Sequence, residues 1–297
     1  MTGTEPLEGA APAVGAPLLE ATGITKRYGR YTALDAVDLR IEAGRTVSVV
    51  GESGSGKSTL ARVIIGLERP DSGSVRFRGE PVRGRRARRA FRHSVGMVFQ
   101  DPYESIDPRL TIGEVVAEPL RAHGLYRRDG AARVRELLDS VGMEGVDPDA
   151  YPHRFSGGQR QRVCIARAVA TDPELVICDE PTSALDVSVQ AQILNLLLDL
   201  QRRRGLSYLF ITHDLEVVRR ISDEVDVLLR GTVVERGTAE QVTSRPQHEY
   251  TRRLLGAVPA ISPRQRRIGA PLISDAPAVP DSKESTESKE SKESNSA

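Results

Sequence analysis

Short apolar runs of strand length recur along the chain and alternate with stretches of helical spacing. The clearest runs are Thr46–Val50, Leu175–Cys178 and Tyr208–Ile211. Nearly continuous apolar runs are typical of parallel strands that are covered on both faces. Val189–Arg202 has its apolar residues at helical spacing and separates two of these runs. The alternation predicts an α/β fold with a mainly parallel sheet.

A second pattern lies between the first and second apolar runs. Ile112–His123 and Ala131–Val141 have the spacing of two amphipathic helices. We therefore expect a helical insertion within the α/β core, at about residues 101–160.

The carboxyl ends of the predicted strands are the first places to look for a site. Ligands of open parallel sheets bind outside these ends. Gly51, Asp179 and His213 follow the three runs. These residues are therefore candidates for binding or catalysis.

Both ends of the chain differ from its middle. Residues 1–17 are rich in Ala, Pro and Gly, and residues 263–297 end in DSKESTESKESKESNSA. Such segments bury too little apolar surface to offset the entropy lost on ordering, so we expect disordered tails around a folded domain at residues 18–262. No secretion signal or membrane-length apolar stretch is visible, which predicts a cytoplasmic chain that does not cross a membrane.

The composition is that of an ordinary soluble protein. Hydrophobic residues make up 39% of the chain, and 42 basic residues nearly cancel 41 acidic ones, so no net field draws it to nucleic acid or lipid. Cys164 and Cys178 are too few for a disulfide framework or a four-thiolate metal site, and we expect both to be small buried hydrophobes in a reducing compartment.

One local exception is a basic block. Eight arginines lie between Arg76 and Arg92, against the single acid Glu80. Such a block can bind nucleic acid, but few aromatic residues are interleaved with it. A solvated connector is the preferred interpretation, with a nucleic-acid surface as the alternative.

GESGSGKST fits the phosphate-loop pattern G-x-x-x-x-G-K-[ST] at every fixed position, after an apolar run and before a helical stretch. Glycines let backbone N–H groups surround phosphate oxygens, and the lysine adds positive charge. The hydroxyl of the residue directly after the lysine binds Mg²⁺. A glycine-rich turn with a surface lysine is the structural alternative. The predicted nucleotide-binding residues of this loop are Gly51, Glu52, Ser53, Gly54, Ser55, Gly56, Lys57, Ser58 and Thr59.

Two carboxylates end the second apolar run. Asp179 is expected to hold Mg²⁺, and Glu180 to orient or deprotonate an attacking water. A strand that simply ends in a charged turn is the alternative, which the upstream phosphate loop makes less favourable.

FSGGQRQR contains a second predicted anion site. Ser156 and Gln159 have the spacing of a capping box at a helix start. Gly157 and Gly158 are costly at a helix start unless something approaches the backbone closely. The positive end of the helix then favours an anion.

These motifs resemble those of the ATP-binding cassette (ABC) family. Ser156–Gln159 is similar to its signature, Gln100 to its Q-loop, Asp186 in SALD to its D-loop, and His213 to its switch histidine. The resemblance implies a P-loop NTPase (RecA-like) core with a mainly parallel sheet, an N-terminal antiparallel β part and an inserted α-helical subdomain.

The resemblance also implies roles for single residues. ATP and Mg²⁺ would be the cofactors, with Ser58, Gln100 and Asp179 at the metal. Glu180, His213 and Gln100 would be catalytic, and Tyr28 would stack on adenine, with nearby Tyr31 as the alternative. Two cassettes would dimerise head to tail, so that the signature of one chain meets the phosphate loop of the other.

Further segments resemble the ATPase subunits of bacterial oligopeptide and dipeptide importers: Asp101–Arg109, Tyr151–His153, Ala184–Gln192 and Pro246–Thr251. The implied partners are a second, different ATPase subunit, two transmembrane permease subunits and an extracellular solute-binding protein, without nucleic acid. The implied location is peripheral, on the cytoplasmic face of the membrane. Arg154, Glu249, Glu104 and Asp107 depart from the usual residues of this subfamily.

Alternative functions remain open at this point. Close relatives of these importers carry nickel or other small solutes. A soluble cassette acting on DNA or ribosomes is less favoured, because the chain has one cassette and only 105 positions separate Gly51 from Ser156. A binder that does not hydrolyse ATP is disfavoured by the intact Lys57, Asp179, Glu180 and His213.

Overall fold

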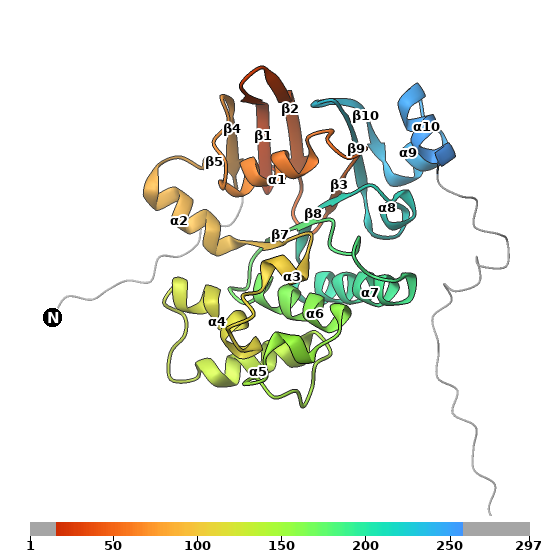
Figure 1. Cartoon of the computed structure of the whole chain (residues 1–297). Helices are drawn as coiled ribbons and strands as arrows, with labels where there is room; N and C mark the ends of the chain where they lie inside the picture. The colour runs from red at the N-terminus through yellow and green to blue at the C-terminus, as the bar shows by residue number, and fades with distance from the viewer. Residues whose placement is uncertain (1–15, 258–297) are drawn as a thin grey trace, which may run out of the picture. The chain divides into compact units, whose positions relative to one another are not determined.

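The computed structural model describes residues 16–257, in which a parallel sheet carries the predicted site (Figure 1). Its strand order is β10-β9-β3-β8-β7-β6. Every neighbouring pair is parallel except β9 with β10. The strands are β3 (Thr46–Val50), β6 (Val95–Val98), β7 (Leu175–Asp179), β8 (Ser207–Thr212), β9 (Glu224–Leu229) and β10 (Thr232–Thr238).

A second sheet is antiparallel and comes from the N-terminal part of the chain. Its order is β2-β1-β4-β5, and its strands lie at the top of Figure 1. The expected antiparallel β part is thereby confirmed. The strands are β1 (Leu19–Tyr28), β2 (Tyr31–Ile41), β4 (Ser72–Phe77) and β5 (Glu80–Pro81).

Helices follow most strands of the parallel sheet. None of them, within the described part of the chain, is both long and apolar enough to cross a membrane. They are α1 (Lys57–Ile65), α2 (Gly84–Ser94), α3 (Pro102–Ser105), α4 (Ile112–Ala122), α5 (Gly130–Ser140), the 3₁₀ helix η1 (Pro152–Arg154), α6 (Gly157–Ala168), α7 (Val187–Arg204), α8 (Leu215–Ile221), α9 (Ala239–Ser244) and α10 (Glu249–Ala257).

Alternate residues of β7 enter two different hydrophobic cores. Leu175 and Ile177 pack with α1 and the antiparallel sheet, whereas Val176 and Cys178 pack with α4 to α7. Side chains of a strand alternate between the two faces of a sheet, so both faces of β7 are covered. This burial explains the unbroken apolar run, and it confirms that Cys178 is a buried hydrophobe. Burial also raises the pKa of its thiol.

The helical insertion lies between β6 and β7 and comprises α3 to α6. Its helices occupy the lower part of Figure 1. Thr111 caps α4 in a capping box with Glu114. Helix α6 extends beyond the expected end near residue 160 to Ala168.

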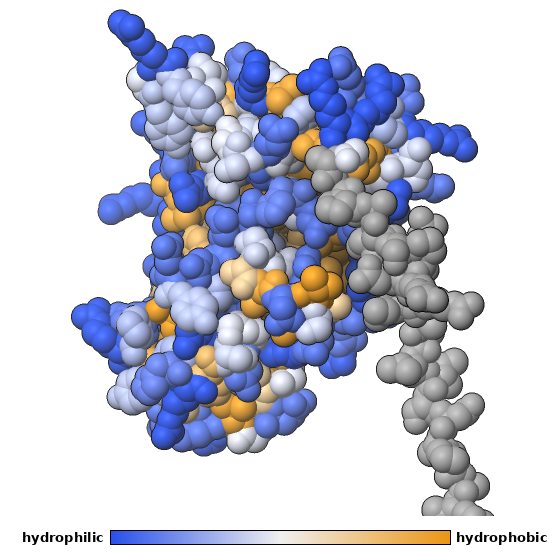
Figure 2. Space-filling view, turned by 45° about the vertical axis from the view of Figure 1, so that its right-hand side comes forward, coloured by the Kyte–Doolittle hydropathy of each residue, from blue (hydrophilic) through white to orange (hydrophobic). Residues whose placement is uncertain are grey.

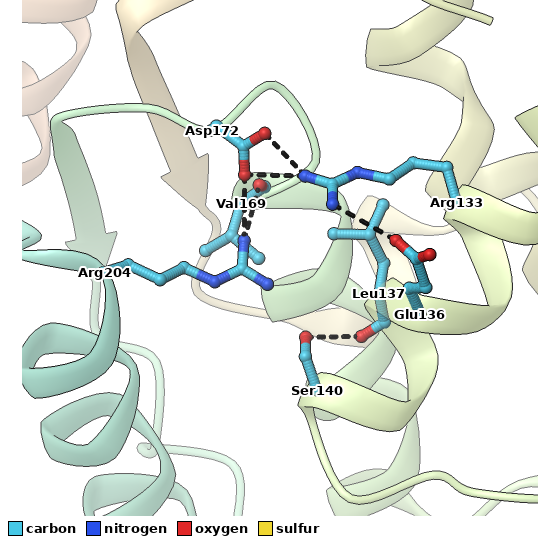
Figure 3. Close-up of polar contacts among 7 residues, drawn as sticks. All are labelled: Arg133, Glu136, Leu137, Ser140, Val169, Asp172 and Arg204. Carbon is cyan, nitrogen blue, oxygen red and sulfur yellow. Dashed lines mark hydrogen bonds and ion pairs between the residues drawn. The ribbon is translucent and has the colours of Figure 1, made fainter.

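A shared carboxylate ties this insertion to the core (Figure 3). Asp172, in the loop after α6, accepts hydrogen bonds from Arg133 of α5 at 2.6 and 2.7 Å and from Arg204 of α7 at 3.2 Å. Its φ of 52° lies in the left-handed region, which Asp adopts more readily than most residues. The contact therefore joins the insertion, the loop before β7 and the end of α7.

Residues outside the cores form a mainly hydrophilic surface. On the face shown in Figure 2, hydrophobic residues form separate smaller areas. The basic block lies mostly on α2, where its arginines are exposed. The two predicted tails lie outside the described residues, apart from residues 16 and 17.

Candidate functional site

The phosphate loop connects β3 to α1 at the carboxyl end of the sheet. Gly54 and Gly56 have φ values of 79° and 109°, which glycine adopts without strain. A Cβ on Gly51 would lie 2.2 Å from the Leu228 carbonyl oxygen, and one on Gly56 would lie 2.4 Å from that of Ala33. The glycines are therefore required by both the turn and the close approach of neighbouring backbone.

Lys57 points into the loop from the first turn of α1. Its side chain is buried, and its Nζ donates to the carbonyl oxygens of Gly51 and Glu52 at 2.8 Å each. Burial lowers the pKa of Lys57, while the carboxylates of Glu180 and Asp179 act in the opposite direction. The loop thus encloses a cation beside backbone that curves around it.

Ser55 supplies a test of whether this cradle suits phosphate. Its hydroxyl is buried inside the loop and has no hydrogen-bond partner among the described residues. A buried polar atom without a partner is costly. A phosphate oxygen at the loop would satisfy it, so the residues present fit a nucleotide's phosphate groups.

Ser58 and Asp179, two of the three residues predicted at the metal with Gln100, lie within hydrogen-bond distance of each other. The Ser58 hydroxyl donates to Asp179 Oδ1 at 3.0 Å, although the residues are 121 positions apart. Burial raises the pKa of Asp179, and the Ser58 hydrogen bond opposes this shift. Within residues 16–257 no group of three or more His, Cys, Asp or Glu side chains forms a metal cluster. A hydroxyl and one carboxylate suit Mg²⁺, which usually binds few protein ligands together with phosphates and waters.

Glu180 is the meeting point of the predicted catalytic residues. Gln100 Nε2 donates to Glu180 Oε2 at 3.2 Å, and His213 Nδ1 lies 3.3 Å from the same oxygen. All three line a cavity of about 790 Å³ together with Asp179. Gln100 follows β6, Glu180 follows β7 and His213 follows β8. Three neighbouring parallel strands therefore deliver these side chains to one place.

The backbone of Glu180 is itself unusual. Its φ is 46°, in the left-handed region that non-glycine residues seldom occupy. Its N–H donates to the Ile211 carbonyl oxygen at 2.9 Å, which links the end of β7 to β8. Strained backbone of this kind is concentrated at functional sites. The turn directs the Glu180 side chain toward Gln100 and His213.

The two candidate residues for stacking on adenine, Tyr28 and Tyr31, are both exposed and lie near the phosphate loop. Tyr28 is 45% exposed, and its hydroxyl contacts the Glu68 carboxylate. Tyr31 is 55% exposed, and its hydroxyl donates to the Gly54 carbonyl oxygen at 3.0 Å. Burial, followed by the nearby Glu68 carboxylate, raises the pKa of Tyr28. The assignment of Tyr28 to adenine stays a prediction, with Tyr31 as the alternative.

The signature residues begin α6 away from these side chains. Ser156 N–H donates to Gln159 Oε1 at 3.0 Å, and Gln159 N–H donates to Ser156 Oγ at 3.3 Å, so the capping box has formed. None of Ser156, Gly157, Gly158 and Gln159 lines the cavity at Glu180 or the second cavity beside the phosphate loop. The chain therefore presents two separate candidate anion sites.

The two signature glycines have different environments. A Cβ on Gly158 would lie 2.5 Å from Val189 Cγ1 of α7, so helix packing alone requires glycine there. A Cβ on Gly157 would meet its nearest atoms at 3.6 and 3.8 Å, which is ordinary contact. Close approach of a ligand is thus one explanation for Gly157, whereas the chain's own packing explains Gly158.

Asp186 caps the next helix. Its carboxylate accepts from the Ser188 hydroxyl at 2.6 Å and from the Val189 N–H at 3.0 Å. These bonds, the one from Ser188 first, lower the pKa of Asp186. The neighbouring Val187 is largely exposed at the start of α7.

Tyr250 has no role that the sequence alone predicts, although it lies within one of the segments that resemble the importers. Its buried side chain rises from α10, and its hydroxyl oxygen accepts a hydrogen bond from the Glu52 N–H at 2.9 Å. The two residues are 198 positions apart. No local pattern could have predicted this contact.

The parallel sheet, the glycine loop before α1 and the carboxylates at the end of β7 define the class: a P-loop nucleotide-binding domain. Comparison with known families refines it. Residues 34–183 match the family model described as ABC transporter. Residues 234–285 match "Oligopeptide/dipeptide transporter, C-terminal region". The chain belongs to the ABC transporter family and is of its oligopeptide/dipeptide transporter type, as the motifs predicted.

Individual relatives agree with this family. The oligopeptide transport ATP-binding protein OppD of Mycobacterium tuberculosis is 51% identical over 84% of this chain and 41% of its own length. The dipeptide transport ATP-binding protein DppF of Haemophilus influenzae is 44% identical over 88% of this chain and 84% of its own. The chain thus spans about two fifths of OppD and most of DppF.

A solved structure supports the fold assignment. The ATP-binding cassette MJ0796, solved as a dimer in a post-hydrolysis state bound to ADP and phosphate, has a TM-score of 0.66 and 32% identity. The similarity covers 74% of this chain and 98% of that one.

Proposed function

We propose that this chain hydrolyses ATP to drive uptake of oligopeptides or dipeptides through partner membrane subunits. The observation that carries the proposal is the convergence of Gln100 and His213 on Glu180, beside the Ser58–Asp179 pair. The C-terminal family match and the peptide transporters among the relatives support the solute class.

Each of these residues has a distinct role in ATP hydrolysis. Backbone N–H groups of the phosphate loop and the Lys57 ammonium bind the phosphates, and Ser58 and Asp179 hold the metal. Mg²⁺, when bound, supplies positive charge that offsets the charge of the transferring phosphoryl group. Water attacks the γ-phosphorus while the bond to the bridging β-phosphate oxygen breaks. Glu180 orients that water and accepts its proton, and Gln100 and His213 hold the water and the γ-phosphate in line.

The second half of the site comes from another chain in this proposal. The Ser156 helix start has a positive end and lines neither cavity at the phosphate loop or Glu180. A second cassette, facing head to tail, would bring its own helix start to the γ-phosphate bound at Lys57. ATP then joins the two chains, and hydrolysis weakens that bridge. A related but different ATPase chain is the proposed partner.

An apolar groove supports docking of a membrane subunit. It has a volume of about 430 Å³, and most of the residues around it are apolar. Its lining includes Leu67 just after α1, Phe99 beside Gln100, and Pro119 of α4. Exposed apolar grooves of this kind commonly bind partners. A permease segment in this groove would contact the residue next to Gln100, so opening and closing at the site would reach the membrane.

Transport by the isolated complex tests the proposal. The complex is purified from membranes with its solute-binding protein, reconstituted in vesicles, and supplied with ATP and labelled peptides of two or more residues. We expect ATP-dependent peptide uptake, which Glu180→Gln abolishes while ATP binding persists. Uptake of Ni²⁺ instead of peptide would show that the transported solute is a metal ion. Undiminished hydrolysis by Glu180→Gln would overturn the role of Glu180.

A further inference from the structure

The exposed side of α2 carries a dense group of positive charges that the nucleotide site does not use. Arg85, Arg86, Arg88 and Arg89 are exposed, and the helix contains no acidic residue. Within residues 16–257, none of the four side chains makes a hydrogen bond or ion pair. Three other arginines of the basic block have side-chain partners: Arg76 donates to the Gly79 carbonyl oxygen, Arg78 to Glu174 and Arg92 to the Gly66 carbonyl oxygen. We call these four residues the arginine face.

A buried residue near the end of α2 anchors the helix. Phe91 is buried and packs edge-on against Phe77 of β4, with ring centroids 5.2 Å apart. Phe91 belongs to the hydrophobic core under the antiparallel sheet. Because the helix is anchored, the arginines are held outward rather than on a free loop.

Helix α2, which carries the arginine face, ends beside the apolar groove proposed above for a membrane subunit. Arg92, at the end of α2, lines that groove and donates to the Gly66 carbonyl oxygen at 3.1 Å. His93 of α2 packs edge-on against His123 at the end of α4, at 5.2 Å. Burial lowers the pKa of His123, and the neighbouring His93 and Arg89 side chains act in the same direction. The end of α2 therefore lies beside the groove in which a membrane subunit would dock.

The net charge of +1 hides this local field, because acidic residues elsewhere balance it. Exposed charges separated by more than about 10 Å are largely screened at physiological salt, so distant acids cannot neutralise the face. A bilayer surface rich in anionic lipid attracts such clusters of basic residues.

Two features favour lipid over nucleic acid as the partner. Binding of single-stranded nucleic acid relies on exposed aromatic side chains for stacking. The only aromatic ring of α2 besides His93 is that of Phe91, which is buried. Four long side chains without fixed partners also suit a fluid layer of headgroups better than a defined base sequence.

We propose that the arginine face binds anionic phospholipid headgroups of the membrane beside the docked permease. The proposal rests on the proposed function, since that function brings the chain to a membrane. It gives the chain a direct contact with lipid in addition to its contact with protein.

Vesicle flotation with the full chain tests the proposal. Phosphatidylcholine vesicles are compared with vesicles that also contain about 30% phosphatidylglycerol, an anionic lipid. We expect the chain to bind only the anionic vesicles, and to be released at about 0.5 M salt. The variant Arg85→Gln, Arg86→Gln, Arg88→Gln and Arg89→Gln should bind roughly 100-fold more weakly.

A charge-matched control separates the face from net charge. Arg202→Gln, Arg203→Gln, Arg245→Gln and Arg252→Gln also removes four exposed arginines and should retain binding. Equal loss in both variants, or equal binding to both kinds of vesicle, would overturn the proposal. Tighter binding to duplex DNA than to anionic vesicles at the same salt would also overturn it, in favour of nucleic acid.

The assembled complex distinguishes lipid from an acidic protein partner. In membranes of phosphatidylcholine alone, the variant with glutamine at all four positions of the arginine face should assemble with the permease and hydrolyse ATP like the wild type. Failure of this variant to assemble in such membranes would show that the arginine face contacts the permease, and it would overturn the lipid proposal. Because flotation does not require transport, it can fail while peptide uptake succeeds, and the reverse also holds.

Discussion

At the scale of single residues, two tyrosines from different elements hydrogen-bond to the phosphate loop. Tyr31, from the antiparallel sheet, donates to the Gly54 carbonyl oxygen. Tyr250, from α10, accepts from the Glu52 N–H. A loop that binds phosphate through backbone N–H groups depends on its shape before the ligand arrives. These hydroxyls therefore act as positioning groups for the nucleotide site.

Tyr250→Phe removes only one of these hydroxyls and leaves the buried ring. Loss of one such hydrogen bond, typically about 0.5–1.5 kcal/mol, should raise the KM for ATP roughly 2- to 10-fold with little change in kcat. Steady-state hydrolysis by the assembled complex measures both constants. Tyr126→Phe, on an exposed tyrosine after α4, is the control and should behave like the wild type. An unchanged KM in Tyr250→Phe would contradict the positioning role.

The signature glycines allow a matched pair of substitutions. Gly158→Ala places a methyl group against Val189, so it should lower the free energy of unfolding by about 1–3 kcal/mol. Gly157→Ala has ordinary space within the chain, so its stability should be unchanged while turnover in the complex falls. Denaturant unfolding and ATPase assays separate the two effects. Normal turnover in Gly157→Ala would argue against close contact of a phosphate with this backbone.

At the scale of elements, the parallel strands were the most predictable part of the fold. Runs such as Leu175–Cys178 are apolar because two cores need their alternate side chains, and burial on both faces leaves a plain signal in the sequence. The antiparallel strands gave no comparable run, and their prediction depended on the family resemblance. In β2, buried residues such as Leu34 alternate irregularly with exposed ones, and the pairing with β1 contains register shifts.

The site was predictable only in part, for a related reason. Gln100, Glu180 and His213 each follow a parallel strand, so topology places them together once the strands are recognised. Neither the left-handed turn at Glu180 nor the contact between Tyr250 and Glu52 has a local signal. Both arise from contacts between segments far apart in the chain.

The attachment of the helical insertion gives a prediction at this scale. Asp172→Asn keeps a residue that tolerates positive φ but removes the charge shared by Arg133 and Arg204 (Figure 3). Because Asp172 is largely exposed, overall stability should fall by no more than about 1 kcal/mol. Amide hydrogen exchange should nevertheless become faster in α5 than in the wild type, and remain unchanged in β7. Unchanged exchange in α5 would contradict the proposed tie.

At the scale of the whole molecule, the chain presents two anion sites that do not share a cavity. The phosphate loop and the Glu180 cluster occupy the carboxyl end of the parallel sheet, whereas the Ser156 helix start lines neither cavity there. Under the proposed function, one chain would supply two unlike halves of a site. In the proposed head-to-tail pair each half would meet its complement, and ATP binding and hydrolysis would alternately close and open the pair.

The most direct test of this account is ATP turnover by the assembled complex carrying Ser156→Arg. The isolated variant should bind ATP like the wild type, because Lys57, Ser58 and Asp179 are untouched. Loss of the cap lowers stability by only about 1 kcal/mol, which thermal unfolding of the isolated chain would register. In the complex, turnover should fall at least about 10-fold, since the arginine would displace the helix start from the partner's phosphate. Turnover equal to that of the wild type would contradict the shared site.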